Sequence, residues 1–246
     1  MTALRRALFV SCVVITLSGV IEGEAHADRS ARANFAATAL ALPAAAGDNV
    51  QAEDTRFTTA HARNLTVAGV ATTSLTCDAC TGQSVTYQVV YAGTASSVVA
   101  GNVATAWASG CGGCHGWALS LQLVILRSAR TVTAANRALA LNAACVDCAT
   151  AAAAIQIVVV GTSGRQLSKQ AIAAISAQRD QLIAQLTWMS AQPSPLAGRR
   201  AVPQAGSGPN AATDGAVAAT TARIQDVLTA DLQAVSAAHR IKVARG

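Results

Sequence analysis

The sequence predicts an α+β protein in which antiparallel β-hairpins repeat and C-terminal helices pack against them. Three observations lead to this fold class. A Cys-x-x-Cys pair occurs three times, and the first cysteines of the pairs, Cys77, Cys111 and Cys145, follow one another at intervals of 34 residues. Bulky and small side chains alternate after each pair, which is the period of a β-strand. After residue 160 the apolar residues change to helical spacing.

Residues 1–27 have the features of an export signal. Arginines at 5–6 precede a mostly apolar run over 7–21, and small residues at both ends of the 25–27 tripeptide suit a signal peptidase. The run is shorter than the roughly 20 apolar residues that span a bilayer. We therefore expect a secreted or cell-surface protein with no stable membrane span after the signal is removed.

Residues 28–63 are expected to form a disordered leader, because they are polar and rich in alanine and contain Pro43, Gly47 and a charged stretch at 53–56. Residues 64–190 are expected to form the domain, with three 34-residue units and one packing helix. Each unit is interpreted as a strand, a Cys-x-x-Cys turn and a second strand. The alternative is an all-α array of helical hairpins, because alanine-rich residues 149–154 alone favour a helix.

The best strand pattern follows the second cysteine pair, where Trp117, Leu119 and Leu121 alternate with Ala118 and Ser120. This alternation places bulky side chains on one face and small ones on the other. Four aromatic residues of the repeat are expected in the core: Tyr87, Tyr91, Trp107 and Trp117.

A glutamine occurs at the same place in each unit, at Gln88, Gln122 and Gln156. All three belong to the face with small side chains. Stacked amides could bond one another across units, or each could satisfy nearby backbone groups. The pattern leaves both possibilities open.

An amphipathic helix is predicted over residues 167–189, with Ser168 as a possible cap and its apolar stripe on the bulky face of the sheet. Residues 191–212 contain four prolines with glycine and serine, as is typical of a linker. Residues 213–246 are predicted to contain a second helix followed by a basic tail.

The composition favours a small-residue core that needs covalent support. Alanine is abundant, whereas aromatic residues make up only 3% of the chain, so each residue buries little area. The net charge of +6 comes from scattered basic residues. Because nucleic-acid-binding proteins usually concentrate such residues on one face, no nucleic-acid partner is expected.

Removal of the signal would leave six cysteines, and an even number in an exported chain indicates disulfides. The expected disulfide cysteines are Cys77, Cys80, Cys111, Cys114, Cys145 and Cys148. Six cysteines allow 15 pairings, among which the sequence does not choose.

Three other uses of the cysteines are weighed against disulfides. Thiol–disulfide exchange needs a stabilised thiolate. Asp78 and Asp147 lie within two of the pairs, where their negative charge would raise the pKa of a neighbouring thiol. Zinc can bind two Cys-x-x-Cys pairs, but the spacing here is long and leaves one pair over. The run from Cys111 through Cys114 to His115 matches the attachment motif of c-type haem. The other two units have no histidine at this position.

The arrangement Asn-x-Ala-x-Ala-x-Asn-x-x-Cys-x-x-Cys at residues 136–148, followed by Ala-Ile-Gln-Ile-Val-Val-Val at 154–160, resembles cysteine-pair repeat modules of actinobacterial secreted proteins. Such modules also occur at the C-terminus of proteins labelled putative peptide zinc metalloproteases. The resemblance covers about residues 68–190 and implies an exported module. The chain has no His-Glu-x-x-His motif, so the protease activity is not implied.

The function expected from the sequence is that of an exported, disulfide-stabilised structural or interaction protein without enzymatic activity. No nucleophile elbow, phosphate loop or catalytic triad signature occurs in the sequence. We expect no catalytic residue, resident metal or cofactor, and a protein or cell-envelope component as the partner. A redox, Cys-zinc or c-type haem protein is the alternative.

Overall fold

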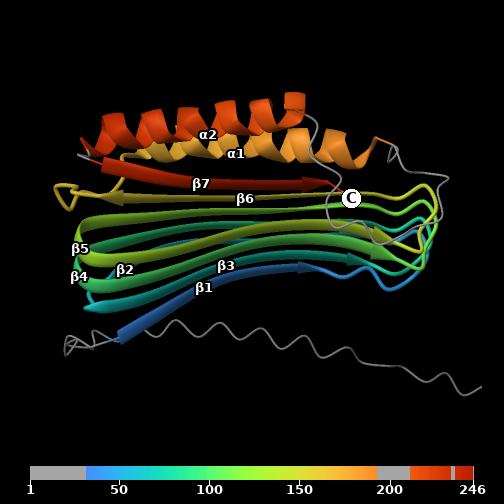
Figure 1. The fold of residues 1–246 in the computed structure, drawn as a ribbon, viewed down its shortest axis with the longest axis horizontal. Coiled ribbons are helices and arrows are strands. Elements are labelled where there is room, and N and C mark those ends of the chain that lie inside the picture. The colour runs from blue at the N-terminus through green and yellow to red at the C-terminus, as the bar shows by residue number, and fades with distance from the viewer. Residues whose placement is uncertain (1–31, 193–210, 234–235, 246) are drawn as a thin grey trace, which may run out of the picture.

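The computed structural model describes residues 32–192, 211–233 and 236–245 (Figure 1). The predicted export signal and nearly all of the predicted linker lie outside the described residues. The strands are β1 (Arg32–Ala41), β2 (Asn49–Ala60), β3 (Asn64–Leu75), β4 (Thr81–Ser109), β5 (His115–Ala143), β6 (Ala149–Val160) and β7 (Ser236–Arg245). The helices are α1 (Lys169–Ser190) and α2 (Ala211–Leu232).

The chain winds as a β-solenoid of about 4 turns. Strands β1 to β6 pair in parallel, and β7 pairs antiparallel with β6. β4 and β5 pair with a constant offset that places Gln88 beside Gln122 and Asn102 beside Asn136. Each 34-residue unit is therefore one turn of the coil, and equivalent residues of successive turns stack in columns.

The prediction of α+β structure is confirmed in its coarse form, since the molecule has seven strands and two helices in the described ranges, and the all-α alternative is wrong. The antiparallel hairpin pairing is also wrong. At each Cys-x-x-Cys turn the chain passes from one side of the coil to the other, so the flanking strands pair with neighbouring turns and not with each other. Side-chain alternation has the same period in parallel and antiparallel sheets, so the alternation could not distinguish them.

The coil is flattened into two layers. Layer A consists of β1, β3, residues 97–109 of β4 and residues 131–143 of β5. Layer B consists of β2, residues 81–92 of β4, residues 115–126 of β5, then β6 and β7. Side chains cross between the layers, as when the Nδ2 of Asn102 donates to the carbonyl of Ile155 at 3.0 Å.

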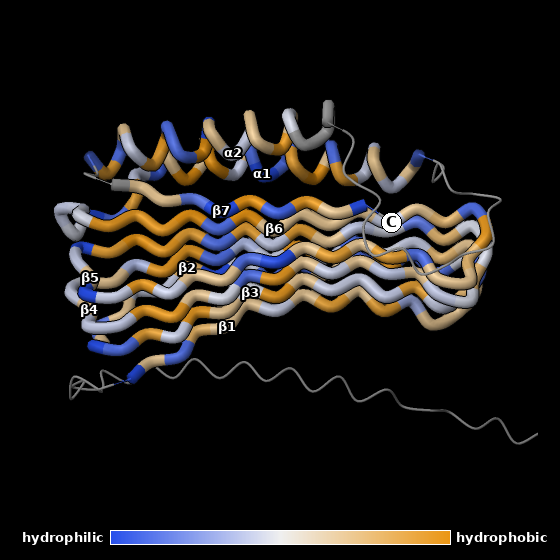
Figure 2. The backbone as a smooth tube through the Cα atoms, viewed as in Figure 1, coloured by the Kyte–Doolittle hydropathy of each residue, from blue (hydrophilic) through white to orange (hydrophobic). Residues whose placement is uncertain are grey.

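The space between the layers is filled by small and polar side chains in columns. Alanines form one interior cluster, and valines with Leu65 and Leu126 form another. Between them, Gln88, Gln122 and Gln156 form a buried column, and a hydrophilic band crosses neighbouring strands near the middle of the sheet (Figure 2). Parallel stacking of identical turns brings like side chains together, as in other in-register β-structures.

The bulky residues point out of layer B and are covered by the two helices, as the sequence predicted for residues 167–189. Ile175, Leu182 and Leu186 of α1 belong to the same buried cluster as Leu121 and the outward valines of layer B. The helices lie side by side (Figure 1), with α1 over β5 and β6 and α2 over β7.

The N-terminus of α1 is capped as predicted. The Oγ of Ser168 accepts a hydrogen bond from the backbone N–H of Ala171 at 3.1 Å. The same hydroxyl donates to Asp231 of α2, at 2.6 Å, so the cap also joins the two helices.

Three of the four aromatic residues expected in the core are buried: Tyr87, Tyr91 and Trp117. Burial is the main reason why the pKa of Tyr87 is raised above the usual tyrosine value. Trp107 is an exception, with 38% of its surface exposed. It points outward from layer A, and helices α1 and α2 pack on layer B.

Two segments expected to be irregular form strands. Residues 32–60, within the expected disordered leader, contain β1 and β2, and residues 236–245 of the expected basic tail form β7. Neither segment has strong apolar periodicity, and each gains its strand structure by pairing with a neighbouring edge. Tertiary pairing has overridden weak local preference.

Asp54 of β2 joins β2 to β1 at the N-terminal end of the coil. Its Oδ2 accepts the backbone N–H of Thr38 at 2.8 Å, and its Oδ1 accepts the Nε of Arg56 at 2.8 Å. Burial raises the pKa of this carboxyl group, but these two partners more than offset burial, and the net pKa is lowered below 3.8. The folded state therefore favours the ionised carboxylate.

Asp54→Asn is expected to destabilise the protein at pH 7 but not at acidic pH. Because the pKa is lower in the folded state, the stabilisation is present above the unfolded value of 3.8 and is lost as the pH falls through the folded pKa. Urea unfolding of both proteins from pH 7 to pH 2 measures this difference. An equal difference between the two proteins at every pH would contradict the role of the charge.

Candidate disulfide ladder

The three Cys-x-x-Cys segments stack on one another at one corner of the coil. The third residue of each segment, Ala79, Gly113 and Asp147, has a positive φ. The backbone ladder continues through the corner, since the N–H of Ala79 donates to the carbonyl of Gly112 at 2.7 Å, and that of Gly113 donates to Val146. Equivalent turns of the chain therefore hold the cysteines in register.

Within each segment the two sulfurs lie at disulfide bonding distance, which gives the pairs Cys77–Cys80, Cys111–Cys114 and Cys145–Cys148. All six cysteines that the sequence singled out are thus brought together, and the pairing is within segments. The sulfurs form one cluster with Leu75 and Ala108. Cys80 and Cys114 are fully buried. We call the three stacked pairs the sulfur ladder.

The second and third pairs of the sulfur ladder are in contact. The Sγ of Cys111 lies 3.5 Å from that of Cys145 and 3.9 Å from that of Cys148. The ligand atoms of Cys111, Cys114, Cys145 and Cys148 all lie within 4.8 Å of one another. This spacing is also compatible with four sulfurs around one zinc ion.

The surroundings of the sulfurs do not favour thiolates. The Sγ of Cys80 lies 3.1 Å from the carbonyl oxygen of Ala45, and that of Cys114 lies 3.1 Å from the carbonyl oxygen of Cys77. A negatively charged sulfur would be repelled by these oxygens. The carbonyl oxygens therefore suit neutral sulfur better than a reactive thiolate or a metal ligand, and the covalent pairing is indicated by the bonding distance within each segment.

The haem-like run Cys111, Cys114 and His115 is arranged differently from a haem attachment site. Cys114 is fully buried beneath its neighbours, whereas a thioether bond requires the sulfur to reach a vinyl group. The Nδ1 of His115 lies 2.8 Å from the carbonyl oxygen of Ser190 at the end of α1. This histidine joins the start of β5 to the helix.

The predicted glutamine column is a hydrogen-bonded amide ladder. The Nε2 of Gln122 donates to the Oε1 of Gln88 at 3.0 Å, and the Nε2 of Gln156 donates to the Oε1 of Gln122 at 2.7 Å. Each Nε2 also donates to a backbone carbonyl of layer A, at Gly101 or Ala100. Both of the possibilities that the sequence left open are therefore realised.

A second amide column was missed by the sequence reasoning. The Nδ2 of Asn102 donates to the Oδ1 of Asn136 at 2.9 Å, and Asn102 is fully buried. The two asparagines have the same 34-residue spacing as the glutamines. Applying the repeat period to every polar residue, and not only to those after the cysteines, would have found them.

The stacked turns and the sulfur ladder define a disulfide-pinned β-solenoid with a helical cover. No protein-family model, curated protein or solved structure matches this chain. In the part of the chain that the structure describes, neither helix combines the length and apolar character needed to cross a membrane.

Proposed function

We propose that this protein is an exported structural or interaction protein, held by three disulfides, that presents rigid surfaces to a protein or cell-envelope partner and catalyses no reaction. The sulfur ladder carries this proposal. Its three pairs lie at bonding distance, which supports a role for the cysteines as cross-links of the coil. The carbonyl oxygens beside Cys80 and Cys114 disfavour the thiolates that redox chemistry or zinc binding would need. Export into an oxidising compartment is the condition under which such bonds persist.

The interior of the coil supports the same proposal. Asparagine, glutamine, serine and threonine side chains there bond one another, as in the pairs Thr86–Ser120 and Thr73–Ser84. These groups are neutral, and their hydrogen bonds hold the two layers together. The described interior thus serves the fold, and a functional role is left to the surface.

Zinc binding is a second candidate, favoured by the close approach of Cys111, Cys114, Cys145 and Cys148. It requires that these cysteines remain reduced, and zinc would then be held by two neighbouring rungs. The carbonyl oxygen of Cys77 beside Cys114 weighs against it, as does the third pair, which zinc would leave unused.

Intact mass measurement of the exported protein is expected to show a gain of six hydrogens on reduction, from the three pairs. Alkylation before reduction should modify none of these cysteines, and non-reducing peptide mapping should join Cys111 to Cys114. Metal analysis and an insulin-reduction assay of the same sample test the alternatives. Alkylation without reduction, one zinc per chain or reductase turnover would contradict the proposal.

A further inference from the structure

The two layers of the solenoid end at different levels at the C-terminal end. Layer B continues from β6 to β7, whereas layer A stops at residues 131–143 of β5. Those residues pair with β4 on one side, and no described strand pairs with them on the other. The outer edge of residues 131–143 therefore has no described strand beside it, and we call residues 131–143 the open edge. The open edge itself lies over the boundary between β6 and β7, since the Nδ2 of Asn136 donates to the carbonyl oxygens of Ala154 and Arg240.

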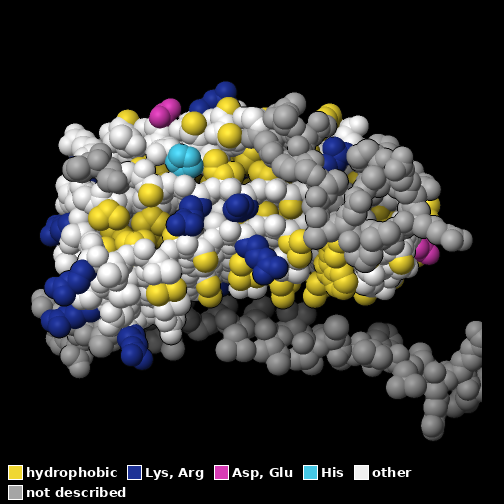
Figure 3. All heavy atoms as spheres, in the orientation of Figure 1, with side chains coloured by type: hydrophobic (Ala, Val, Ile, Leu, Met, Phe, Trp, Pro, Cys, Tyr) yellow, Lys and Arg dark blue, Asp and Glu magenta, His cyan; other side chains and the backbone are white. Residues whose placement is uncertain are grey.

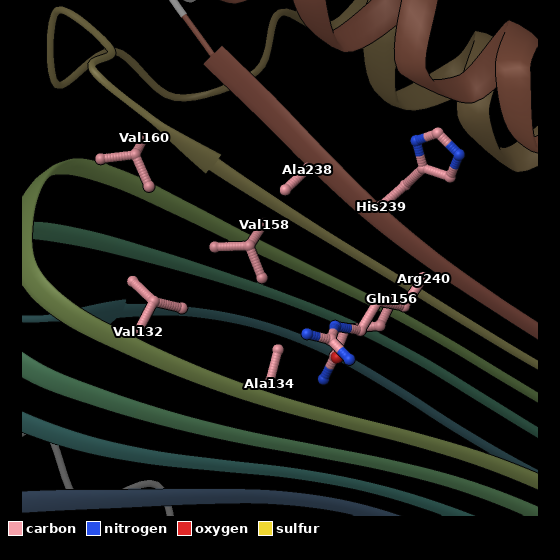
Figure 4. A pocket seen from close by; sticks show the side chains of 8 residues that line it. All are labelled: Val132, Ala134, Gln156, Val158, Val160, Ala238, His239 and Arg240. Atoms are coloured by element: carbon pink, nitrogen blue, oxygen red, sulfur yellow. The ribbon is translucent and has the colours of Figure 1, made fainter.

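A groove of about 410 Å³ lies beside the open edge (Figure 4). Val132 and Ala134 of the open edge line one side, and residues of β6 and β7 line the other. The apolar lining side chains are small, and Val132 is 39% exposed. The apolar part of the lining thus resembles the solenoid interior but lacks a covering strand, whereas His239 and Arg240 add basic groups to it.

The amide ladder ends in this groove with an unsatisfied acceptor. The Oε1 of Gln88 and that of Gln122 each accept an amide from the next turn. Gln156 is 1% exposed and lines the groove, and its Oε1 has no hydrogen-bond partner. A buried acceptor without a partner costs about 1–3 kcal/mol, so the groove favours an occupant that supplies a donor.

The groove and its rim are basic. His239 and Arg240 of β7 line the groove, and Arg240 lies beside Gln156 (Figure 4). Arg137 of the open edge and Lys242 of β7 lie nearby, and all four side chains are exposed. None of these four side chains forms an ion pair with an acidic residue of the described ranges. Lys and Arg side chains gather across the middle and left of this face, where few acidic side chains are visible (Figure 3). Charge complementarity therefore favours an acidic occupant.

A second copy of this chain does not fit the open edge. Continuation of the coil by another copy would place its β1 on the open edge and its β2 on β6, but β7 already pairs with β6. β1 also contributes Arg32 and no acidic residue to the rim. The position therefore suits a single strand from another protein.

We propose that the open edge receives one extended, acidic segment of a partner protein, which adds a strand to layer A and covers the groove. The segment would place small side chains inward, with a hydrogen-bond donor for Gln156, and an acidic side chain outward beside Arg137. Strand addition of this kind takes its affinity from backbone hydrogen bonds and its specificity from alternate side chains. This inference rests on the proposed function, since it names the partner of an interaction protein.

The probe is a fluorescent synthetic peptide based on the sequence of residues 97–109, the strand of layer A that precedes the open edge. In this peptide, serine replaces Ala100 and glutamate replaces Val103. Threonine replaces the other residues that face outward. The register of β4 on β5 places Val103 beside Arg137, so the glutamate should meet that arginine. Two control peptides carry lysine in place of the glutamate, or alanine in place of the serine.

Fluorescence anisotropy with the oxidised full chain is expected to show saturable binding of the acidic probe. The lysine peptide should bind on the order of tenfold more weakly, and the alanine peptide about fivefold more weakly. Arg137→Glu should reverse the preference between the glutamate and lysine peptides. Val132→Lys should abolish binding by placing a charge in the groove, whereas Val99→Lys, at a comparably exposed position on the outer face of the same layer, should not.

The proposal is overturned if the acidic probe does not bind, if the lysine peptide binds as tightly, or if Val132→Lys and Val99→Lys behave alike. It is also overturned if light scattering shows self-association that Val132→Lys abolishes, because the occupant would then be a second copy. The cysteine state is measured on the same sample. Free thiols would contradict the proposed function, whereas three intact disulfides without probe binding would contradict only this inference.

Discussion

Gln122→Met is expected to lower the free energy of unfolding by about 3 to 5 kcal/mol, since two or more buried polar groups would each lose a partner worth 1–3 kcal/mol. Gln122 is fully buried at the centre of the amide ladder. Its removal leaves the Oε1 of Gln88 without its donor and takes one donor from the carbonyl of Gly101. Gln156 would lose its acceptor in the ladder and keep only the carbonyl of Ala100. Methionine keeps the length of the side chain, so the change tests the amide.

Thermal and urea unfolding of the oxidised protein measure this effect, and the expected loss corresponds to roughly 10 °C in melting temperature for a domain of this size. Gln51→Met is the matched control, because Gln51 is exposed on β2, and it should change stability by less than about 0.5 kcal/mol. Equal stability of Gln122→Met and the parent protein would show that the amide ladder does not hold the layers together.

Gly116→Ala is expected to destabilise the protein by about 2 to 3 kcal/mol, which is typical of an overpacked interior. A Cβ at this position would lie 2.9 Å from the carbonyl oxygen of Gly82 and 2.9 Å from a methyl group of Leu75. Because the carbonyl oxygen belongs to the neighbouring turn, relief would require the two turns to move apart. Glycine is needed here for close approach of the chains.

Gly101→Ala is the matched control for this prediction. Gly101 also lies within a strand and has no positive φ, and a Cβ there would meet no atom within 4 Å. Alanine should therefore be neutral or slightly stabilising, because it reduces the freedom of the unfolded chain. If the two variants unfold at the same urea concentration, close packing between the turns is not the reason for glycine at position 116.

Much of the candidate site follows from the repeat period alone. Equal spacing of the cysteine pairs and of Gln88, Gln122 and Gln156 means that equivalent residues occupy equivalent places, whatever the pairing of the strands. Strand alternation around Leu121 and helical spacing around Leu182 are local properties of the chain, and both predictions are confirmed. These features were predictable because they depend on near neighbours in the sequence.

The direction of strand pairing and the location of the free edges depend on contacts between distant residues. β1 and β2 have little strand signal of their own and pair as parallel strands with β3 and β4. No described strand pairs with the outer edge of residues 131–143, because the chain leaves the coil for α1 after β6.

The sequence by itself determined the period of the repeat, the alternation within each strand and the six cysteines that meet at one corner. The tertiary structure alone decided that the turns stack in parallel, that Asp54 joins β2 to β1 at one end of the coil and that Gln156 faces a groove at the other. The physical reason is that alternation constrains only which face a side chain occupies. The neighbour of a strand, and the end of a layer, are set by the packing of the whole coil.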